Sequence, residues 1–364
     1  MTLKAKRKRL VLPIDDFMKI VFTGGGTMGP VTPLLAVWEA WRVVDPTVEA
    51  LWVGTKRGPE RSTVEAQGIP FFSLPIARFP RYLSFEWLTF PFHFVWAFLK
   101  AIQIIRLQKP DLIASAGGFT AVPVIFAGNL LGVNSWVHQQ DVELILTNKL
   151  TIPFADLVTV AWEQNRKDLG DRVRLVGNPV RPSRLLGVKE RAYTQFALQK
   201  HKPTVLVFGG GTGALWLNEV MREIASELCV TANLIHVTGT GKMIESQHLD
   251  HHVFEFLDAE MADALAIADV VVCRAGLSTI TELAALKKSA ILIPLPRSPQ
   301  EANAQMVNDA CIVVDELHTS PQQLGETIQE LLKDAERRKN LGEKMYQKLR
   351  THIAEELVTM LQKI

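Results

Sequence analysis

Short runs of apolar, mostly β-branched residues alternate with stretches of helical periodicity along most of the chain. This alternation is typical of parallel strands joined by crossover helices, and it predicts an α/β fold. Strands are expected at residues 19–23, 51–53, 112–115, 135–138, 157–160 and 173–176, and then at 204–208, 234–237, 270–273 and 290–293. The first helix is expected at 33–41, and residues 321–364 have the pattern of helices with charged faces.

The pattern is interrupted near residue 180. Gly177-Asn178-Pro179 is a turn cluster, and residues 181–202 are polar without a strand run. We therefore expect a basic arm at 1–18, a doubly wound domain at 19–180, a linker at 181–202, a second doubly wound domain at 203–345 and a C-terminal helix at 346–364. A chain of 364 residues is long enough for two such domains. Ligands of doubly wound sheets bind at the carboxyl ends of the strands.

Two glycine-rich loops occur at equivalent places, each directly after the first strand of its half. They are Gly24-Gly25-Gly26-Thr27-Met28-Gly29 and Gly209-Gly210-Gly211-Thr212-Gly213. Glycine lets the backbone come close to a ligand and direct N–H groups at an anion or a sugar hydroxyl. Neither loop has the spacing of a dinucleotide site or the Lys-Ser/Thr of a P-loop, which argues against a dehydrogenase. Their repetition favours a ligand cleft shared by the two domains.

A third candidate element begins where the strand at 270–273 ends. Ser278 or Thr279 could cap the following helix, whose free N–H groups could bind a diphosphate without a metal ion. Glu282 comes one turn later and could accept two hydrogen bonds from a ribose diol. Its alternative role is structural, since a carboxylate is favoured near a helix N-terminus.

Residues 79–98 hold nine of the 28 aromatic residues of the chain. Pro91 suits a first helical turn, and Phe92, Val95, Trp96 and Leu99 recur at the spacing of one helical face. A membrane span is disfavoured because Lys100 interrupts it, and a lysine in mid-bilayer costs about 2.5–3.5 kcal/mol. Two interpretations remain, a core helix packed on a sheet or an interfacial surface at a lipid membrane.

Composition narrows the function classes further. The net charge is +2, and no basic stripe or RNA-binding motif occurs, so we expect no nucleic-acid partner. Cys229, Cys273 and Cys311 lack C-x-x-C spacing and are expected to be reduced thiols of a cytosolic protein. His251-His252 is an isolated pair expected on a loop surface, and no metal site is expected.

These loops fall in an order that resembles the MurG family of N-acetylglucosaminyltransferases, over residues 19 to about 304. The matching segments include Ala116-Gly117-Gly118-Phe119, His138-Gln139-Gln140-Asp141, Leu146-Thr147-Asn148-Lys149, Val176-Gly177-Asn178-Pro179-Val180-Arg181, Arg274-Ala275-Gly276-Leu277-Ser278-Thr279 and Gln300-Glu301-x-Asn303-Ala304. The resemblance implies a GT-B fold, in which two Rossmann-like domains face a central cleft. It also implies inverting, metal-independent transfer of GlcNAc from UDP-GlcNAc to the muramyl 4-hydroxyl of lipid I, giving lipid II for peptidoglycan.

The resemblance further implies no cofactor besides the donor substrate, and a polyprenyl-pyrophosphoryl-MurNAc-peptide as acceptor. The protein would be peripheral, at the cytoplasmic face of the membrane, with the aromatic segment 79–106 facing the lipid. Donor-binding roles would fall to Arg181, Gly210, Gly211, Thr212, Leu257, Leu277, Ser278, Thr279, Glu282, Gln300 and Glu301. Acceptor-binding roles would fall to Gly25, Gly26, Thr27, Gly29 and Asn148.

The acceptor side departs from the family pattern. Pro30 stands where the family usually has the histidine of Gly-Gly-His, and His138-Gln139-Gln140-Asp141 replaces His-Glu-Gln-Asn. The remaining candidates for the catalytic base are Asp141 and His138, although His138 ends an apolar strand and could be structural. The alternatives are an inactive GT-B protein that binds UDP-sugar, a transferase for another lipid-linked acceptor, and a nucleotide-sugar epimerase.

Overall fold

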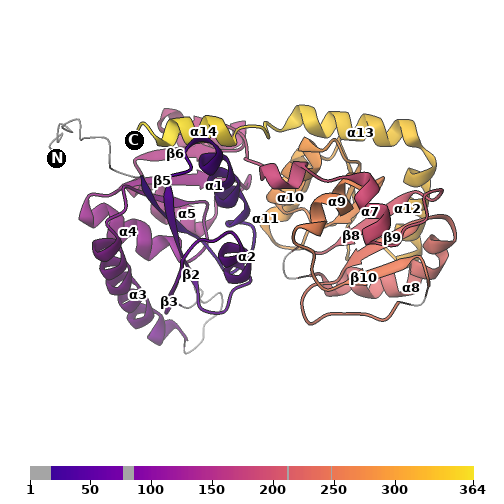
Figure 1. Ribbon diagram of the computed structural model, residues 1–364, viewed down its shortest axis with the longest axis horizontal. Helices are drawn as coiled ribbons and strands as arrows, with labels where there is room; N and C mark the ends of the chain where they lie inside the picture. The colour runs from indigo at the N-terminus through magenta and orange to yellow at the C-terminus, as the bar shows by residue number, and fades with distance from the viewer. Residues whose placement is uncertain (1–17, 77–85, 211–212, 247) are drawn as a thin grey trace.

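The computed structural model describes residues 18–76, 86–210, 213–246 and 248–364, with the backbone alone for 86–89. It consists of two α/β halves, drawn from indigo to magenta and from magenta to yellow in Figure 1. Residues 1–17 of the expected basic arm, Gly211, Thr212 and the aromatic residues Phe79, Tyr82 and Phe85 lie outside the described residues.

The first half is a seven-stranded parallel sheet in the order β3-β2-β1-β4-β5-β6-β7. Its strands are β1 (Lys19–Thr23), β2 (Glu49–Thr55), β3 (Phe71–Leu74), β4 (Leu112–Ser115), β5 (Asn134–Gln139), β6 (Leu157–Val160) and β7 (Arg174–Leu175). Its helices are α1 (Thr32–Val44), α2 (Glu60–Ala66), α3 (Glu86–Gln108), α4 (Ala121–Leu131), α5 (Leu146–Thr151) and α6 (Glu163–Leu169), with short 3₁₀ turns at Ile152–Phe154 (η1) and Gly170–Arg172 (η2).

The second half is a six-stranded parallel sheet in the order β10-β9-β8-β11-β12-β13. Its strands are β8 (Thr204–Phe208), β9 (Asn233–Val237), β10 (His251–Phe254), β11 (Val270–Cys273), β12 (Ala290–Leu292) and β13 (Ile312–Val313). Its helices are α8 (Leu215–Thr231), α9 (Glu260–Ile267), α10 (Leu277–Ala285), α11 (Pro299–Met306), α12 (Pro321–Lys333) and α13 (Ala335–Lys348). The expectation that His251 and His252 lie on a loop surface is wrong, because both belong to β10 and His251 is buried.

Both sheets confirm the doubly wound fold class. The strand order reverses beside β1 in the first sheet and beside β8 in the second, so each glycine loop starts at a topological switch point. All ten predicted strands occur within two residues of their expected bounds. The polar segment 181–202 contains the 3₁₀ turn η3 (Pro182–Leu185) and helix α7 (Lys189–Gln195).

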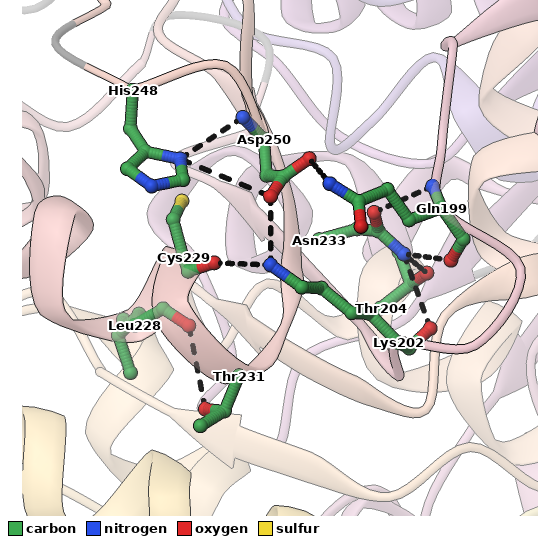
Figure 2. A network of polar contacts seen from close by, with 9 residues as sticks. All are labelled: Gln199, Lys202, Thr204, Leu228, Cys229, Thr231, Asn233, His248 and Asp250. Atoms are coloured by element: carbon green, nitrogen blue, oxygen red, sulfur yellow. Dashed lines mark hydrogen bonds and ion pairs between the residues drawn. The ribbon is translucent and has the colours of Figure 1, made fainter.

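The end of this segment is bonded into the second half by a polar network (Figure 2). Lys202 Nζ donates to Asp250 Oδ2 and to the Cys229 carbonyl, both at 2.8 Å. Gln199 Nε2 donates to the other Asp250 oxygen at 2.5 Å, and the Asn233 amide joins Gln199 to Lys202 through their carbonyls. The polar residues at the end of the expected linker therefore serve as hydrogen-bond partners.

The last helix, α14 (Ala354–Leu361), returns to the first half and lies beside α1, as Figure 1 shows in yellow. Its residues Leu357, Val358 and Leu361 are buried in the same core as Trp41 and Trp52. The chain thus crosses between the halves twice, and the two crossings touch: Asn178 N donates to Arg350 O at 3.1 Å, and Val180 N donates to Thr351 O at 3.4 Å. A Cβ on Gly177 would lie 2.2 Å from Arg350 O, so this approach requires glycine.

Helix α3 packs on the sheet with one face only. It begins at Glu86, so Pro91 lies inside the helix and not in its first turn as expected. Ala97, Ala101 and Ile104 are buried against the first half. Among the described residues, the stretch Phe90–Gln108 of α3 is long and apolar enough to span a bilayer, and 22% of that window is buried in the protein.

Candidate active site

The glycine loop after β1 is held by a buried carboxylate that sequence reasoning missed. Glu60 Oε2 accepts from Gly26 N at 3.2 Å, and Glu60 Oε1 accepts from the Thr55 N–H and hydroxyl. The loop after β4 packs closely against this glycine loop, since a Cβ on Gly118 would lie 2.8 Å from Gly25 N. The two loops leave no room for side chains there. Of the predicted acceptor residues, Gly25 and Gly26 are buried and Thr27 is exposed.

The segment after β5 is fixed by Gln139. Its amide nitrogen donates to Asp141 O at 2.7 Å and to Glu143 O at 2.8 Å, while its oxygen accepts from Asn148 Nδ2 at 2.7 Å. An ionised glutamate could not donate the first two bonds. The glutamine that replaces the family's usual glutamate therefore shapes the loop that carries Asp141.

His138 lies in a chain of directed hydrogen bonds that joins the two halves. Asn178 Nδ2 donates to Thr281 Oγ1 on α10 at 2.8 Å, so the Asn178 oxygen faces the ring and His138 Nε2 donates to it at 3.0 Å. His138 Nδ1 therefore accepts from the Thr159 hydroxyl at 2.9 Å, and Trp136 Nε1 donates to the same hydroxyl oxygen at 2.8 Å. Both ring nitrogens are engaged and the ring is fully buried. This environment is typical of a structural histidine.

The pKa of His138 predicts a loss of stability in acid. Burial lowers this pKa from 6.5 to about 4, so between these values the unfolded chain binds a proton that the folded chain does not. The free energy of unfolding should therefore fall as the pH falls from 7 to 5, and the buried His236 and His251 act in the same direction. In His138→Gln the fall should be smaller than in wild type.

Urea titrations at pH 7 and pH 5 measure this difference. His201→Gln, which changes an exposed imidazole, is the matched control and should keep the full fall. If the pH dependence in His138→Gln equals that of the wild type, His138 binds its proton equally well in the folded and the unfolded chain, and the prediction is wrong.

Asp141 lies where the two halves meet. Its Oδ1 accepts from Asn303 Nδ2 on α11 at 2.8 Å. Burial raises the pKa of Asp141, the Asn303 bond lowers it, and the nearby Glu143 carboxylate raises it. A carboxylate with a raised pKa is a stronger base than an ordinary aspartate, which suits removal of a proton from a hydroxyl.

The N-terminus of α10 faces the first half. Its N-cap residue is Gly276, so the expectation that Ser278 or Thr279 caps the helix is wrong. The Ser278 hydroxyl instead lies 3.3 Å from Gly29 O and 3.4 Å from Gln140 Oε1. The first N–H groups of a helix have no intrahelical partner, so those of residues 277–279 are available to an anion.

Glu282 belongs to a row of alternating charges. Arg184 Nε lies 3.8 Å from Glu282 Oε1, and its guanidinium also reaches Asp258. The predicted donor residue Arg181 pairs with Glu39 of α1 at 2.6 Å. Burial raises the pKa of Glu282, the two arginines lower it, and Glu39 raises it. Neither Glu39 nor Arg184 was singled out from the sequence, because their partners are distant along the chain.

The remaining predicted donor residues surround the carboxyl end of the second sheet. Gly210 is exposed with φ +81°, Leu257 is buried in the core beside α9, and Gln300 Oε1 accepts from Leu295 N at 3.0 Å at the start of α11. Glu301, also on α11, is exposed. Within the described ranges, no three His, Cys, Asp or Glu residues are grouped closely enough to hold a metal ion.

Two family models match most of the chain. The glycosyltransferase family 28 N-terminal domain matches residues 20–160, and the C-terminal domain of the same family matches residues 204–357.

Known proteins match over most of the chain. A Clostridium perfringens protein named UDP-N-acetylglucosamine--N-acetylmuramyl-(pentapeptide) pyrophosphoryl-undecaprenol N-acetylglucosamine transferase is 34% identical over 328 residues, which cover 88% of this chain and 91% of that protein. A Bacillus cereus protein named as transferase 2 of the same kind is 36% identical over 282 residues, 77% of this chain and 80% of that protein. The crystal structure of Acinetobacter baumannii MurG superposes with a TM-score of 0.70 at 25% identity, covering 95% of this chain and all of that one. By sequence and by structure, the chain belongs to the MurG group of glycosyltransferase family 28.

Proposed function

We propose that this protein transfers GlcNAc from UDP-GlcNAc to the muramyl 4-hydroxyl of lipid I, with inversion and without a metal ion. The observation that carries the proposal is the position of Asp141. This half-buried carboxylate of the first half is bonded to α11 of the second half, next to the residues expected to bind the donor sugar. Membership in the MurG group supplies the substrates.

The donor binds at the carboxyl end of the second sheet. Glu282 accepts hydrogen bonds from the ribose hydroxyls, and Gln300 and Glu301 bind the GlcNAc hydroxyls. The free N–H groups at the start of α10 bind the diphosphate and stabilise the charge on departing UDP. Arg181 lies near Glu282, since its charge lowers the pKa of that carboxyl.

The acceptor binds along the first half, beside the glycine loops. Near Gly117, the Asn148 Oδ1 and Thr147 Oγ1 atoms are buried, and neither atom has a hydrogen-bond partner among the described residues. Asp141 removes the proton of the attacking acceptor hydroxyl while the hydroxyl oxygen forms a bond to the anomeric carbon of GlcNAc. The bond from that carbon to the diphosphate breaks, and its electron pair leaves with UDP.

We further propose that the protein binds the membrane through an apolar surface around α3. The surface consists of Phe92, Val95, Trp96 and Leu99 on α3, Leu130 on α4, Leu146 and Leu150 on α5, and Phe154. Ring contacts run from Phe94 through Phe126 to Phe154 and join its elements. It ends on α5, the helix that carries Asn148, so a polyprenyl tail in the lipid would be near the acceptor site.

Trp96→Glu should weaken binding to phospholipid vesicles about tenfold or more. Trp96 is 68% exposed in the protein, so its transfer into the membrane interface removes a large apolar area from water. A glutamate carboxylate at this position would have to lose its hydration to enter the interface, so it opposes binding. Vesicle sedimentation with phosphatidylethanolamine and phosphatidylglycerol measures the effect. Leu249→Glu is the control, because Leu249 is 92% exposed on the second half. An equal loss in both variants would contradict the proposed surface.

Label transfer tests the proposed reaction. Purified protein is incubated with radiolabelled UDP-GlcNAc, a short-chain lipid I analogue and EDTA, and both labelled product and UDP are followed. We expect transfer that needs the acceptor and survives EDTA. Intact donor in the presence of lipid I, with donor binding retained in calorimetry, would support a binding-only protein or another acceptor. Conversion of UDP-GlcNAc without any acceptor would support an epimerase.

A further inference from the structure

Asn303 connects the candidate base to the donor-binding half. Its side chain is fully buried, its Nδ2 donates to Asp141 Oδ1 at 2.8 Å, and its Oδ1 accepts from Val142 N at 3.1 Å. The same nitrogen lies 3.4 Å from Ala275 O in the turn before α10. The amide has a single orientation, because the Val142 N–H requires an oxygen and the Asp141 carboxylate requires a donor.

Asn303 lies on α11 close to the residues that are expected to bind the donor. It follows Gln300 by three residues, so the two side chains are neighbours on the helix. Through Ala275 it also touches the turn that leads to the diphosphate-binding end of α10. One buried amide therefore links the expected sugar site, the expected diphosphate site and Asp141.

We propose that Asn303 is a positioning residue for GlcNAc transfer, which fixes the Asp141 carboxylate relative to the donor sugar by binding one of its oxygens. The inference rests on the proposed function, since it requires Asp141 to be the base. The part of the chain that the structure describes places no donor on Asp141 Oδ2. That oxygen is the one that takes the proton of the acceptor hydroxyl.

Two substitutions near Asp141 should shift its pKa in opposite directions, which allows a test. The Asn303 bond favours the charged carboxylate and lowers the pKa of Asp141, whereas Glu143 disfavours it and raises that pKa. Asn303→Asp keeps an acceptor for the Val142 N–H but replaces the donor to Asp141 with a like charge. Glu143→Gln removes the neighbouring carboxylate and keeps the side-chain size.

The experiment is the pH profile of kcat with saturating lipid I analogue and UDP-GlcNAc. In Asn303→Asp the acid limb of this profile should move to higher pH by about one unit or more. In Glu143→Gln the acid limb should move to lower pH. Asn303→Ala is the second variant, and circular dichroism shows whether each variant is folded.

Two results separate the inference from the function on which it rests. If Asp141→Asn loses kcat but the acid limb stays in place in folded Asn303→Asp and Asn303→Ala, the positioning role is wrong and the base remains assigned. If Asp141→Asn keeps its kcat, the base itself is wrong. A structural role of Asn303 alone would lower the stability and leave the acid limb where it is.

Discussion

Replacing Asp141 by asparagine should lower kcat for GlcNAc transfer by about 10² to 10⁴-fold, the usual contribution of a general base. The substitution keeps the shape of the side chain and removes the group that accepts the proton. Burial raises the pKa of Asp141, so the carboxylate is a stronger base than an exposed aspartate. The KM for UDP-GlcNAc should change little, because Asp141 acts on the acceptor hydroxyl.

Steady-state kinetics at saturating acceptor measure this loss. Asp168→Asn makes the same chemical change at an exposed position on α6 and serves as the control. His138→Gln should keep far more activity than Asp141→Asn, because His138 has both nitrogens engaged within the core. The reverse ranking would assign the base to His138 and contradict the proposed mechanism.

Removing the Glu282 carboxylate should weaken UDP binding about 10- to 100-fold. Hydrogen bonds to a charged group contribute about 1.5–3 kcal/mol each, and a ribose diol can donate two of them. Arg184 and Arg181 lower the pKa of Glu282 against its burial and so favour the charged acceptor that the diol needs. Both Glu282→Ala and Glu282→Gln should show the loss.

Calorimetry with UDP alone separates this effect from catalysis. Glu330→Gln, on the exposed side of α12, should bind UDP like the wild type. UDP affinity close to that of the wild type in Glu282→Ala would remove Glu282 from the donor site and leave it as a partner of Arg184.

The sequence predicted the central strands well because parallel strands are covered on both faces and form continuous apolar runs. It missed β3, β10 and β13, which lie at sheet edges and are only partly buried. The return of α14 to the first half was also not predicted. An amphipathic pattern shows that Leu357 and Leu361 face a core, but it does not show which core.

The candidate site could likewise be predicted only in part from the sequence. Glycine loops and a helix start are local signals, so the backbone elements of the site could be located from the sequence. The side-chain pairs could not, because Arg181 and Glu39 are 142 residues apart and Asn303 and Asp141 are 162 apart. The two interpretations of His138 also required the structure, which supplies a partner for each ring nitrogen.

The stereochemistry and linkage of the product test the central claim most directly. UDP-GlcNAc and a soluble lipid I analogue are incubated with the wild-type protein and EDTA, and the purified product is analysed by NMR. The account predicts GlcNAc attached to the muramyl O4 with the anomeric configuration inverted relative to the donor. A product with retained configuration, attachment at another hydroxyl, or intact donor beside intact acceptor would contradict it.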